Sequence, residues 1–370
     1  MIENRPANED LQIQEIADLM VDQLKKRYPG NDPVLRGVHA KSHGCVSATF
    51  EVVDTGKPEL RVGVLSEPGR VFKALVRFSN AATFVNDDSP KDSSGAQSHG
   101  SRGMAIKILE AAGPLLEPDP AGDTQDFLMI NSPVFAFANV EDYVVLSRVL
   151  LASIDPTTHG DDASGFFKQL LAPSNTNSEQ KTRAQETLGI VGRIRSLAGA
   201  AGAGPFQIPP ASPVDNDYFG AAAFKLGEKQ IMRFRCTPMA PKIEATDISK
   251  PDYLRANFLL RLRDEAAGDI VFKFEIRTKP LEKIEIDNDV ENASKDWKDD
   301  LADQWNHVAT LTIPCQEPLN DEQCEKLEFS PWHCTEDFRP LGGINRLRRA
   351  AYKSSAAFRA AQKDSHGSCD

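Results

Sequence analysis

The stretch INRLRRAAYKSSAAFR, residues 344–359, carries the clearest chemical pattern of the chain. On a helix, Arg348 would lie one turn before Tyr352, and Arg359 would follow two turns later on the same face. A nearby guanidinium favours the phenolate form of a tyrosine, and a phenolate is a strong axial ligand for ferric haem. The stretch therefore predicts a helix that presents a tyrosine ligand. Other segments of the chain must supply the groups that face this tyrosine across the site.

Composition and charge exclude some classes of protein. The 370-residue chain has a formal net charge of −11, whereas a nucleic-acid-binding protein needs a concentrated positive surface. Residues 339–363 are an exception, because they contain seven basic side chains and no acidic one. This stretch fits a solvated helix face, a nucleic-acid patch or a lining for cofactor carboxylates. Since we find no signal-peptide pattern and no window of membrane-spanning length, we predict a cytoplasmic protein with no nucleic-acid partner and no membrane span.

The six cysteines are widely spaced and form no C-x-x-C pair. This spacing is not typical of a zinc site or of a dense disulfide framework, so we predict free thiols. The residues are Cys45, Cys236, Cys315, Cys324, Cys334 and Cys369.

Periodicity predicts an α+β fold. Helical spacing occurs at residues 9–27, 140–152, 178–198 and 252–264, and strand-like runs occur at 46–53, 61–65, 71–78, 103–109, 126–130, 230–237, 269–278 and 307–313. This order favours an antiparallel sheet or barrel with added helices over alternating β-α units. A Gly- and Ala-rich segment at 199–205 is typical of a flexible connection. We divide the chain into an N-terminal helical arm (1–30), a single domain (31–363) and a C-terminal tail (364–370).

The sequence RGVHAKSHG, residues 36–44, places His39 just before a predicted strand. His39 and His43 are four residues apart, a spacing that suits zinc on a helix. The two glycines and the following strand oppose a helix, however, and no glutamate lies between the histidines. A single histidine is more often a hydrogen-bonded structural residue than a catalytic one. The role of His39 therefore depends on other motifs.

Four segments, taken in order, resemble the catalase superfamily. They are RGVHAKSHG, VRFSNAATF at 76–84, HGSRGMAIKIL at 99–109 and FLMINSPVFAF at 127–137. Catalases carry V-H-A-K, R-F-S, R-G-x-A-x-K and N-x-P-V-F in this order, followed by a C-terminal helix with the arginine and tyrosine pattern described above. The segment SPWHCTEDFRPLGGINRLRRAAY, residues 330–352, resembles the C-terminal signature of short catalase-related haem proteins. The resemblance covers roughly residues 34–360.

The resemblance implies an antiparallel eight-stranded β-barrel with surrounding helices, which forms a haem-binding core for haem b. On the distal side it assigns His39 as the base that moves a proton, Ser79 as the hydroxyl that orients it and Asn131 as an amide that steadies the other peroxide oxygen. On the proximal side it assigns Tyr352 as the axial ligand of the haem iron and Arg348 as the group that keeps its oxygen charged.

Other residues would hold the haem itself. The resemblance assigns Arg36, Arg77 and Arg359 to the haem propionates, because these carboxylates need cations. It assigns Val38 and Phe135 to the walls of the pocket. Each residue alone fits an ordinary structural role, so the assignment depends on their joint occurrence.

The chain departs from full-length catalases in ways that bear on its activity. It lacks the wrapping segment and the helical domain that can hold NADPH, so we predict that it binds no NADPH. His43 stands in KSHG where the family has K-G-A-G, and Ala136 stands where a second phenylalanine is common. Both changes favour a wider pocket that admits organic hydroperoxides or an organic electron donor. The superfamily favours oligomers, and both a homodimer and a homotetramer fit this chain.

The sequence thus predicts a haem-dependent oxidoreductase, a catalase or peroxidase, that cleaves hydrogen peroxide or an organic hydroperoxide. One alternative is a fatty-acid hydroperoxide isomerase or lyase of the allene oxide synthase type, which uses the same haem and distal groups. Val38 resembles the catalases, whereas those relatives often have threonine before the histidine. A non-catalytic haem-binding protein, acting as a carrier or sensor, is the second alternative.

Overall fold

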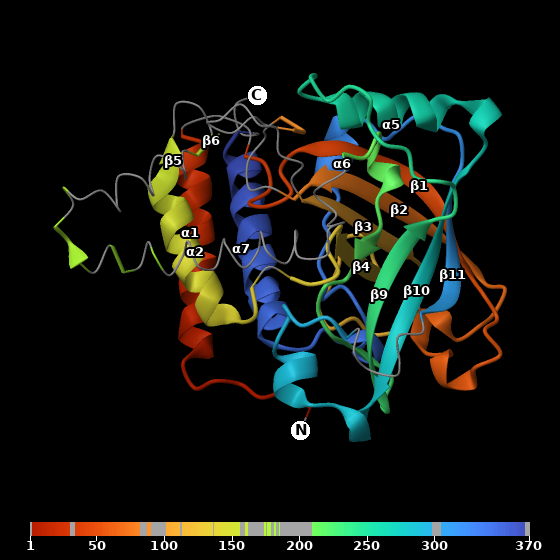
Figure 1. Cartoon of the computed structure of the whole chain (residues 1–370), viewed down its shortest axis with the longest axis horizontal. Helices are drawn as coiled ribbons and strands as arrows, with labels where there is room; N and C mark the ends of the chain where they lie inside the picture. The colour runs from red at the N-terminus through yellow and green to blue at the C-terminus, as the bar shows by residue number, and fades with distance from the viewer. Residues whose placement is uncertain are drawn as a thin grey trace.

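The fold is seen in a computed structural model (Figure 1). It describes residues 2–29, 34–81, 87–89, 101–111, 113–135, 137–155, 160–161, 209–297 and 305–366, together with a few positions between 174 and 185. A β-barrel lies at the right of the view and a layer of helices lies beside it at the left.

Eight antiparallel strands close into the barrel, which confirms the predicted fold class. Their order is β10-β11-β1-β2-β3-β4-β7-β9, and β9 pairs with β10 to complete the ring, while β8 is a further strand on β9. The strands are β1 (Ser42–Val52), β2 (Val71–Asn80), β3 (Arg102–Leu109), β4 (Thr124–Ile130), β7 (Tyr218–Phe219), β8 (Phe224–Leu226), β9 (Gln230–Pro238), β10 (Ile270–Pro280) and β11 (Asn306–Ile313). Strands β7 and β8 are too short to show a period in the sequence.

Aromatic side chains fill the barrel. Side chains alternate along each strand, so every second residue points inward. The ring of Phe127 lies 4.7 Å from that of Phe274 and 5.0 Å from that of Phe234, measured between centroids. Phe50 reaches the same group, 5.2 Å from Phe274. All four rings are buried. The barrel is therefore a packed core, and a large ligand must bind on its outside.

Three helices form the layer beside the barrel. They are α1 (Glu9–Arg27), α2 (Val140–Ser153) and α7 (Gly343–His366). Ile13 and Ile16 of α1 pack with Val144 of α2 and Leu347 of α7 in one buried cluster. Two smaller helices, α5 (Tyr253–Arg263) and α6 (Asp321–Lys326), lie at the upper end of the barrel in Figure 1. None of the described helices combines the length and hydrophobicity that crossing a membrane requires.

The remaining elements are short. β5 (Ile154–Asp155) pairs with β6 (Gly160–Asp161) in a separate ladder. Single helical turns occur at Pro58–Leu60, Gly63–Leu65, Pro213–Asp215, Glu265–Ala267, Leu281–Lys283, Ile286–Val290 and Glu336–Phe338.

One predicted strand, at 61–65, is wrong. This segment contains a 3-10 turn, because Gly63 has a φ of 51° and leaves the extended conformation. The ring of Phe338 packs against Gly63 where a side chain would otherwise lie. Most of the helix predicted at 178–198, and the whole segment 199–205, lie outside the described residues.

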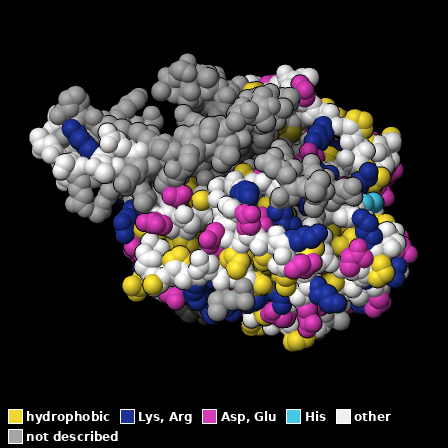
Figure 2. Space-filling view, turned by 60° about the horizontal axis from the view of Figure 1, so that its bottom comes forward, with side chains coloured by type: hydrophobic (Ala, Val, Ile, Leu, Met, Phe, Trp, Pro, Cys, Tyr) yellow, Lys and Arg dark blue, Asp and Glu magenta, His cyan; other side chains and the backbone are white. Residues whose placement is uncertain are grey.

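Charges of both signs are interspersed on the surface. On the face seen in Figure 2, acidic and basic side chains alternate over the described part of the molecule. The basic stretch at 339–363 also has acidic neighbours, since Arg346 forms ion pairs with Glu9 and Glu291. Acids that are distant in sequence neutralise this stretch in part, which does not favour the nucleic-acid alternative.

Candidate active site

A cavity of about 660 Å³ lies between helix α7 and the outer face of strands β2, β3 and β4. Much of its wall is apolar, and includes Met104, Leu128, Ile130, Phe137 and Leu347. Nine of the ten predicted site residues line it, namely Arg36, Val38, His39, Arg77, Ser79, Phe135, Arg348, Tyr352 and Arg359. Segments that are far apart in the sequence thus meet at one cavity.

The strand register explains why this face of the sheet has room for a ligand. Gly103 of β3 lies between Ser79 of β2 and Ile130 of β4. Ala105, two residues further along β3, lies on the same face. Because β3 contributes only a hydrogen atom and a methyl group at these positions, a flat ligand can approach the sheet closely.

His39 lies at the end of the cavity next to Ser79. Its Nδ1 atom is 3.0 Å from Ser79 Oγ, within hydrogen-bonding distance. Its backbone has a φ of 58°, and its carbonyl oxygen accepts a hydrogen bond of 3.0 Å from Arg77 Nη2. Gly103 lies against the imidazole, since a Cβ atom at this position would overlap Nδ1 and Cε1. The position of the ring is therefore fixed on two sides.

The environment of His39 favours the neutral imidazole. Burial, together with the positive charges of Arg77, Arg348 and Arg36, lowers the pKa of His39 to about 3. When Nδ1 donates to Ser79, the neutral ring keeps Nε2 as a proton acceptor. Such a group can act as a base at neutral pH.

Gly103→Ala is expected to push the His39 ring away from Ser79. If the cavity holds haem and cleaves peroxide, as the resemblance implies, we expect the turnover of the haem-loaded variant to fall roughly 100-fold, because a displacement of about 1 Å in a reacting group has an effect of this size. Haem binding should persist, since Gly103 is on the sheet and not on the tyrosine helix. Initial rates at matched haem content measure the effect. Wild-type turnover in a folded Gly103→Ala protein would contradict the role given to this glycine.

Tyr352 lies on α7 at the other wall of the cavity. Arg348 Nη2 is 3.4 Å from the Tyr352 hydroxyl, and its guanidinium carbon is 5.5 Å from the ring centroid. Asn345 accepts a hydrogen bond of 3.1 Å from Arg348 Nη1, which holds the guanidinium in place. A second tyrosine, Tyr143 of α2, also lines the cavity. Burial and the nearby Tyr352 raise the pKa of Tyr143 to about 12, so Tyr143 keeps its proton.

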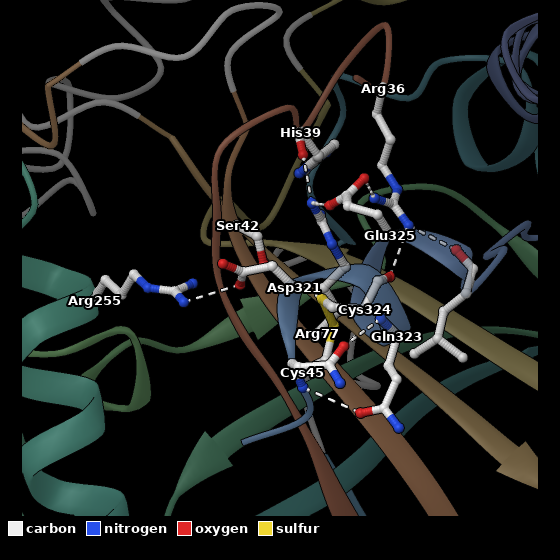
Figure 3. The surroundings of a disulfide bond; sticks show 12 residues. Arg36, His39, Ser42, Cys45, Arg77, Arg255, Asp321, Gln323, Cys324 and Glu325 are labelled. Carbon is white, nitrogen blue, oxygen red and sulfur yellow. Dashed lines mark hydrogen bonds and ion pairs between the residues drawn. A yellow bond between two sulfur atoms is a disulfide. The ribbon is translucent and has the colours of Figure 1, made fainter. Parts of the chain in front are cut away.

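Two of the three predicted propionate arginines contact a glutamate that the sequence analysis did not include. Figure 3 shows the guanidinium groups of Arg36 and Arg77 directed at the carboxylate of Glu325. The distance from Arg77 Nη2 to Glu325 Oε1 is 3.4 Å. No described residue forms an ion pair with Arg359, and its buried Nε atom has no hydrogen-bond partner. Arg359 is therefore available to a further carboxylate.

A disulfide lies next to Glu325 and corrects the prediction that all thiols are free. Cys45 of β1 is bonded to Cys324 of α6, with 5.5 Å between their Cα atoms (Figure 3). The two cysteines are 279 residues apart, and no spacing rule connects them. Cys236, Cys315 and Cys334 are free, and Cys369 is not among the described residues.

Reduction of this disulfide is expected to lower the free energy of unfolding by about 2–4 kcal/mol, because the bond closes a long loop in the unfolded chain. Urea unfolding of the protein with and without dithiothreitol measures the difference. Cys324→Ser should behave like the reduced protein under both conditions. Cys315→Ser, which changes an exposed free thiol, should behave like the wild type. Equal midpoints for oxidised and reduced wild type would contradict a stabilising bond.

Asn131 is buried beside the cavity and is not among the residues that line it. Its Oδ1 atom accepts hydrogen bonds from the backbone nitrogen of Arg102 at 2.7 Å and from Ser101 Oγ at 3.3 Å. Its neighbour Ile130 lines the cavity instead.

His43 also lies away from the cavity. It is fully buried, and its Nε2 atom is 2.9 Å from Asn80 Oδ1. Asn80 in turn donates to Asp88 at 3.1 Å. Burial lowers the pKa of His43 to about 4, although the charge of Asp88 opposes this change. The expectation that His43 widens the pocket is not supported, and Ala136 is outside the described residues.

The sequence analysis missed a buried charged cluster at the other end of the cavity. Lys107 is four residues along β3 from Gly103, a distance of ~13 Å along a strand. Its ammonium group contacts the carboxylates of Asp119 and Asp126. His333 Nδ1 lies 3.0 Å from Asp119 Oδ2 and 3.1 Å from Asp126 Oδ2. Lys107 and His333 both fall within quoted motifs, but nothing in the sequence pairs them.

Comparison with solved structures identifies the fold. A fungal catalase superposes with a TM-score of 0.62 at 16% identity, covering 89% of this chain and 59% of that one. A bacterial catalase gives 0.61 at 17% identity, covering 89% and 57%. Catalase A from Saccharomyces cerevisiae gives 0.61 at 16% identity, covering 89% and 61%. The chain thus spans about three fifths of the length of these catalases.

No protein-family model and no curated protein matches the sequence. The likeness rests on structure, where the closed eight-stranded antiparallel barrel with its helices matches over most of this chain. The chain therefore has the catalase fold.

Proposed function

We propose that the protein binds haem b in this cavity, where Tyr352 would hold the iron, and that it cleaves the O–O bond of a peroxide. One observation carries the proposal: the Tyr352–Arg348 pair on α7 and the His39–Ser79 pair on the barrel line the same apolar cavity. A ligand for iron and a neutral base on opposite walls are what peroxide heterolysis requires.

The described residues fit a haem group. The cavity has the volume of a cofactor site, and Gly103 and Ala105 leave space against the sheet. The partnerless Nε atom of Arg359 is a donor for a propionate. Arg36 and Arg77 already contact Glu325, so a propionate at these arginines would share them with Glu325 or displace it.

The residues of the chain have separate tasks in the proposed reaction. Bound haem iron supplies the redox chemistry of O–O cleavage. His39 Nε2 accepts a proton from one peroxide oxygen and returns it to the leaving oxygen, while Ser79 fixes the ring through Nδ1. Arg348, 3.4 Å from the Tyr352 oxygen, stabilises negative charge on that oxygen. The apolar wall excludes bulk water from the pocket.

An organic hydroperoxide is the second candidate substrate. Ile130 and Leu128 of β4 both line the cavity, two residues apart on the same strand. An apolar wall beside the base favours a substrate with a hydrocarbon chain over hydrogen peroxide. An isomerase or lyase that acts on fatty-acid hydroperoxides uses the same groups, and therefore remains in this proposal.

Oxygen release per peroxide consumed tests the proposal. The protein is loaded with haem, and hydrogen peroxide is supplied in an oxygen electrode without a donor. One oxygen for every two peroxides supports a catalase. Consumption that needs an added donor supports a peroxidase, and conversion of linoleate hydroperoxide without a donor supports the isomerase. A protein that binds no haem, or a haem-loaded protein that consumes none of these peroxides, contradicts the proposal.

A further inference from the structure

His333 lines the cavity but has no part in the proposed cleavage step. It lies within the loop between α6 and α7, and only 6% of its surface is exposed. Its Nδ1 atom lies between the carboxylates of Asp119 and Asp126. No described residue forms a hydrogen bond with Nε2, the other ring nitrogen. A buried histidine therefore lines the cavity, and one of its ring nitrogens has no partner among the described residues.

The charges around His333 require that it be a cation. Asp119 and Asp126 each contribute a negative charge, and both are buried together with Lys107, whose side chain is fully inaccessible. One ammonium leaves one of the two carboxylates uncompensated, and an uncompensated buried charge is costly. Protonated His333 supplies the missing charge. In agreement, the contacts with both aspartates raise the pKa of His333 to about 9, against the opposing effect of burial.

The cluster is not a vacant metal site. Asp119, Asp126 and His333 could each offer one ligand atom, and these atoms lie within 4.8 Å of one another. The ammonium of Lys107 already contacts both carboxylates, so a cation occupies this position. The second ring nitrogen of His333 remains without a partner. As an imidazolium N–H, it can donate a hydrogen bond to an anion in the cavity.

We propose that His333 is a carboxylate-binding group of this cavity, in which Asp119 and Asp126 hold the imidazolium and its remaining N–H binds the ligand. Two sources have this chemistry: a propionate of haem, and the carboxylate of a fatty-acid substrate. The inference rests on the proposed function, because both ligands belong to it. It adds a second anion-binding point to the one that Arg36, Arg77 and Arg359 form.

The first arm of the test compares haem b with its dimethyl ester, in which both propionates are uncharged. Dissociation constants are measured by quenching of tryptophan fluorescence, since Trp332 adjoins His333, and by Soret absorbance. If His333 binds a propionate, His333→Gln should lower the affinity for haem b roughly 10- to 100-fold, as expected for the loss of one hydrogen bond between charged groups. The affinity for the dimethyl ester should stay unchanged.

A matched control is His307→Gln. His307 lies on β11, does not line the cavity, and its Nε2 atom is 3.1 Å from Thr310 Oγ1. It should bind both porphyrins like the wild type. His333→Gln alone leaves a buried carboxylate uncompensated and can therefore unfold. The double variant Asp119→Asn/His333→Gln removes one charge of each sign and keeps the cluster neutral, so it provides the same comparison in a charge-balanced protein.

The second arm detects a substrate carboxylate. Palmitic acid and hexadecanol are titrated into the haem-loaded proteins while the Soret band is followed. If His333→Gln weakens the binding of palmitic acid alone, and the variant still binds haem b more tightly than its dimethyl ester, the ligand of His333 is a fatty acid. If His333→Gln weakens the binding of neither palmitic acid nor haem b, the inference is overturned. If the wild type binds no haem, the proposed function fails, and palmitic acid binding to the apoprotein, followed by fluorescence, decides the role of His333.

Discussion

Tyr352→Phe is expected to remove the tyrosinate-type charge-transfer bands of the haem-loaded protein and to abolish peroxide turnover. Phenylalanine keeps the ring and the packing on α7 but has no oxygen for the iron. Loss of a partner behind a metal ligand typically lowers affinity by about 10- to 100-fold, so loss of the ligand itself should exceed this range. Absorbance titration with haem and the visible spectrum measure both effects.

Tyr143→Phe is the matched control for this experiment. Tyr143 is the other tyrosine that lines the cavity, and its raised pKa of about 12 keeps the phenol neutral. Its variant should retain the charge-transfer bands. If instead Tyr143→Phe loses the bands and Tyr352→Phe keeps them, α7 does not supply the iron ligand. Bands retained in both variants would show that haem binds elsewhere or with another ligand.

Periodicity alone predicted an antiparallel sheet or barrel, and the resemblance to catalases predicted its eight strands and the residues that line the cavity. These residues meet because they lie at ends of strands or on one helix face. Ser79 and Gly103 end up side by side because β2 and β3 are adjacent antiparallel strands. Tyr352 and Arg348 are one turn apart on α7, so their contact follows from helix geometry. Predictions of this kind need only the periodicity of a helix or strand and the knowledge of which strands are adjacent in the sheet.

The sequence did not reveal two kinds of information: which way an individual side chain points, and which residues far apart in the sequence come into contact. The motif around Asn131 does not indicate which of its side chains lines the cavity, and the structure places Ile130 rather than Asn131 in the lining. Glu325 and the Cys45–Cys324 bond depend on the position of α6 beside the barrel, which only the tertiary fold determines. The cluster of Lys107 and His333 likewise joins residues that are more than 200 positions apart.

His39→Ala is expected to lower peroxide consumption by about 100- to 10,000-fold, the usual contribution of a positioned acid–base group. The haem spectrum should stay unchanged, because Tyr352, the proposed iron ligand, lies on the opposite wall. His43→Gln is the matched control, since His43 is a buried histidine four residues away that does not line the cavity. It should retain the wild-type rate. Rates are measured at equal haem content with hydrogen peroxide and with cumene hydroperoxide.

The pH profile separates a base from a merely structural histidine. Because the pKa of His39 is lowered to about 3, the imidazole is neutral throughout the neutral range and gains a proton only in strong acid. Wild-type turnover should therefore show no loss between pH 7 and 5 that is due to this group. An unperturbed histidine, with a pKa of about 6.5, would instead lose most of its basic form over that interval. A rate that falls with a midpoint near pH 6.5 in the wild type, and not in His39→Ala, would show that His39 is solvated rather than held against Ser79.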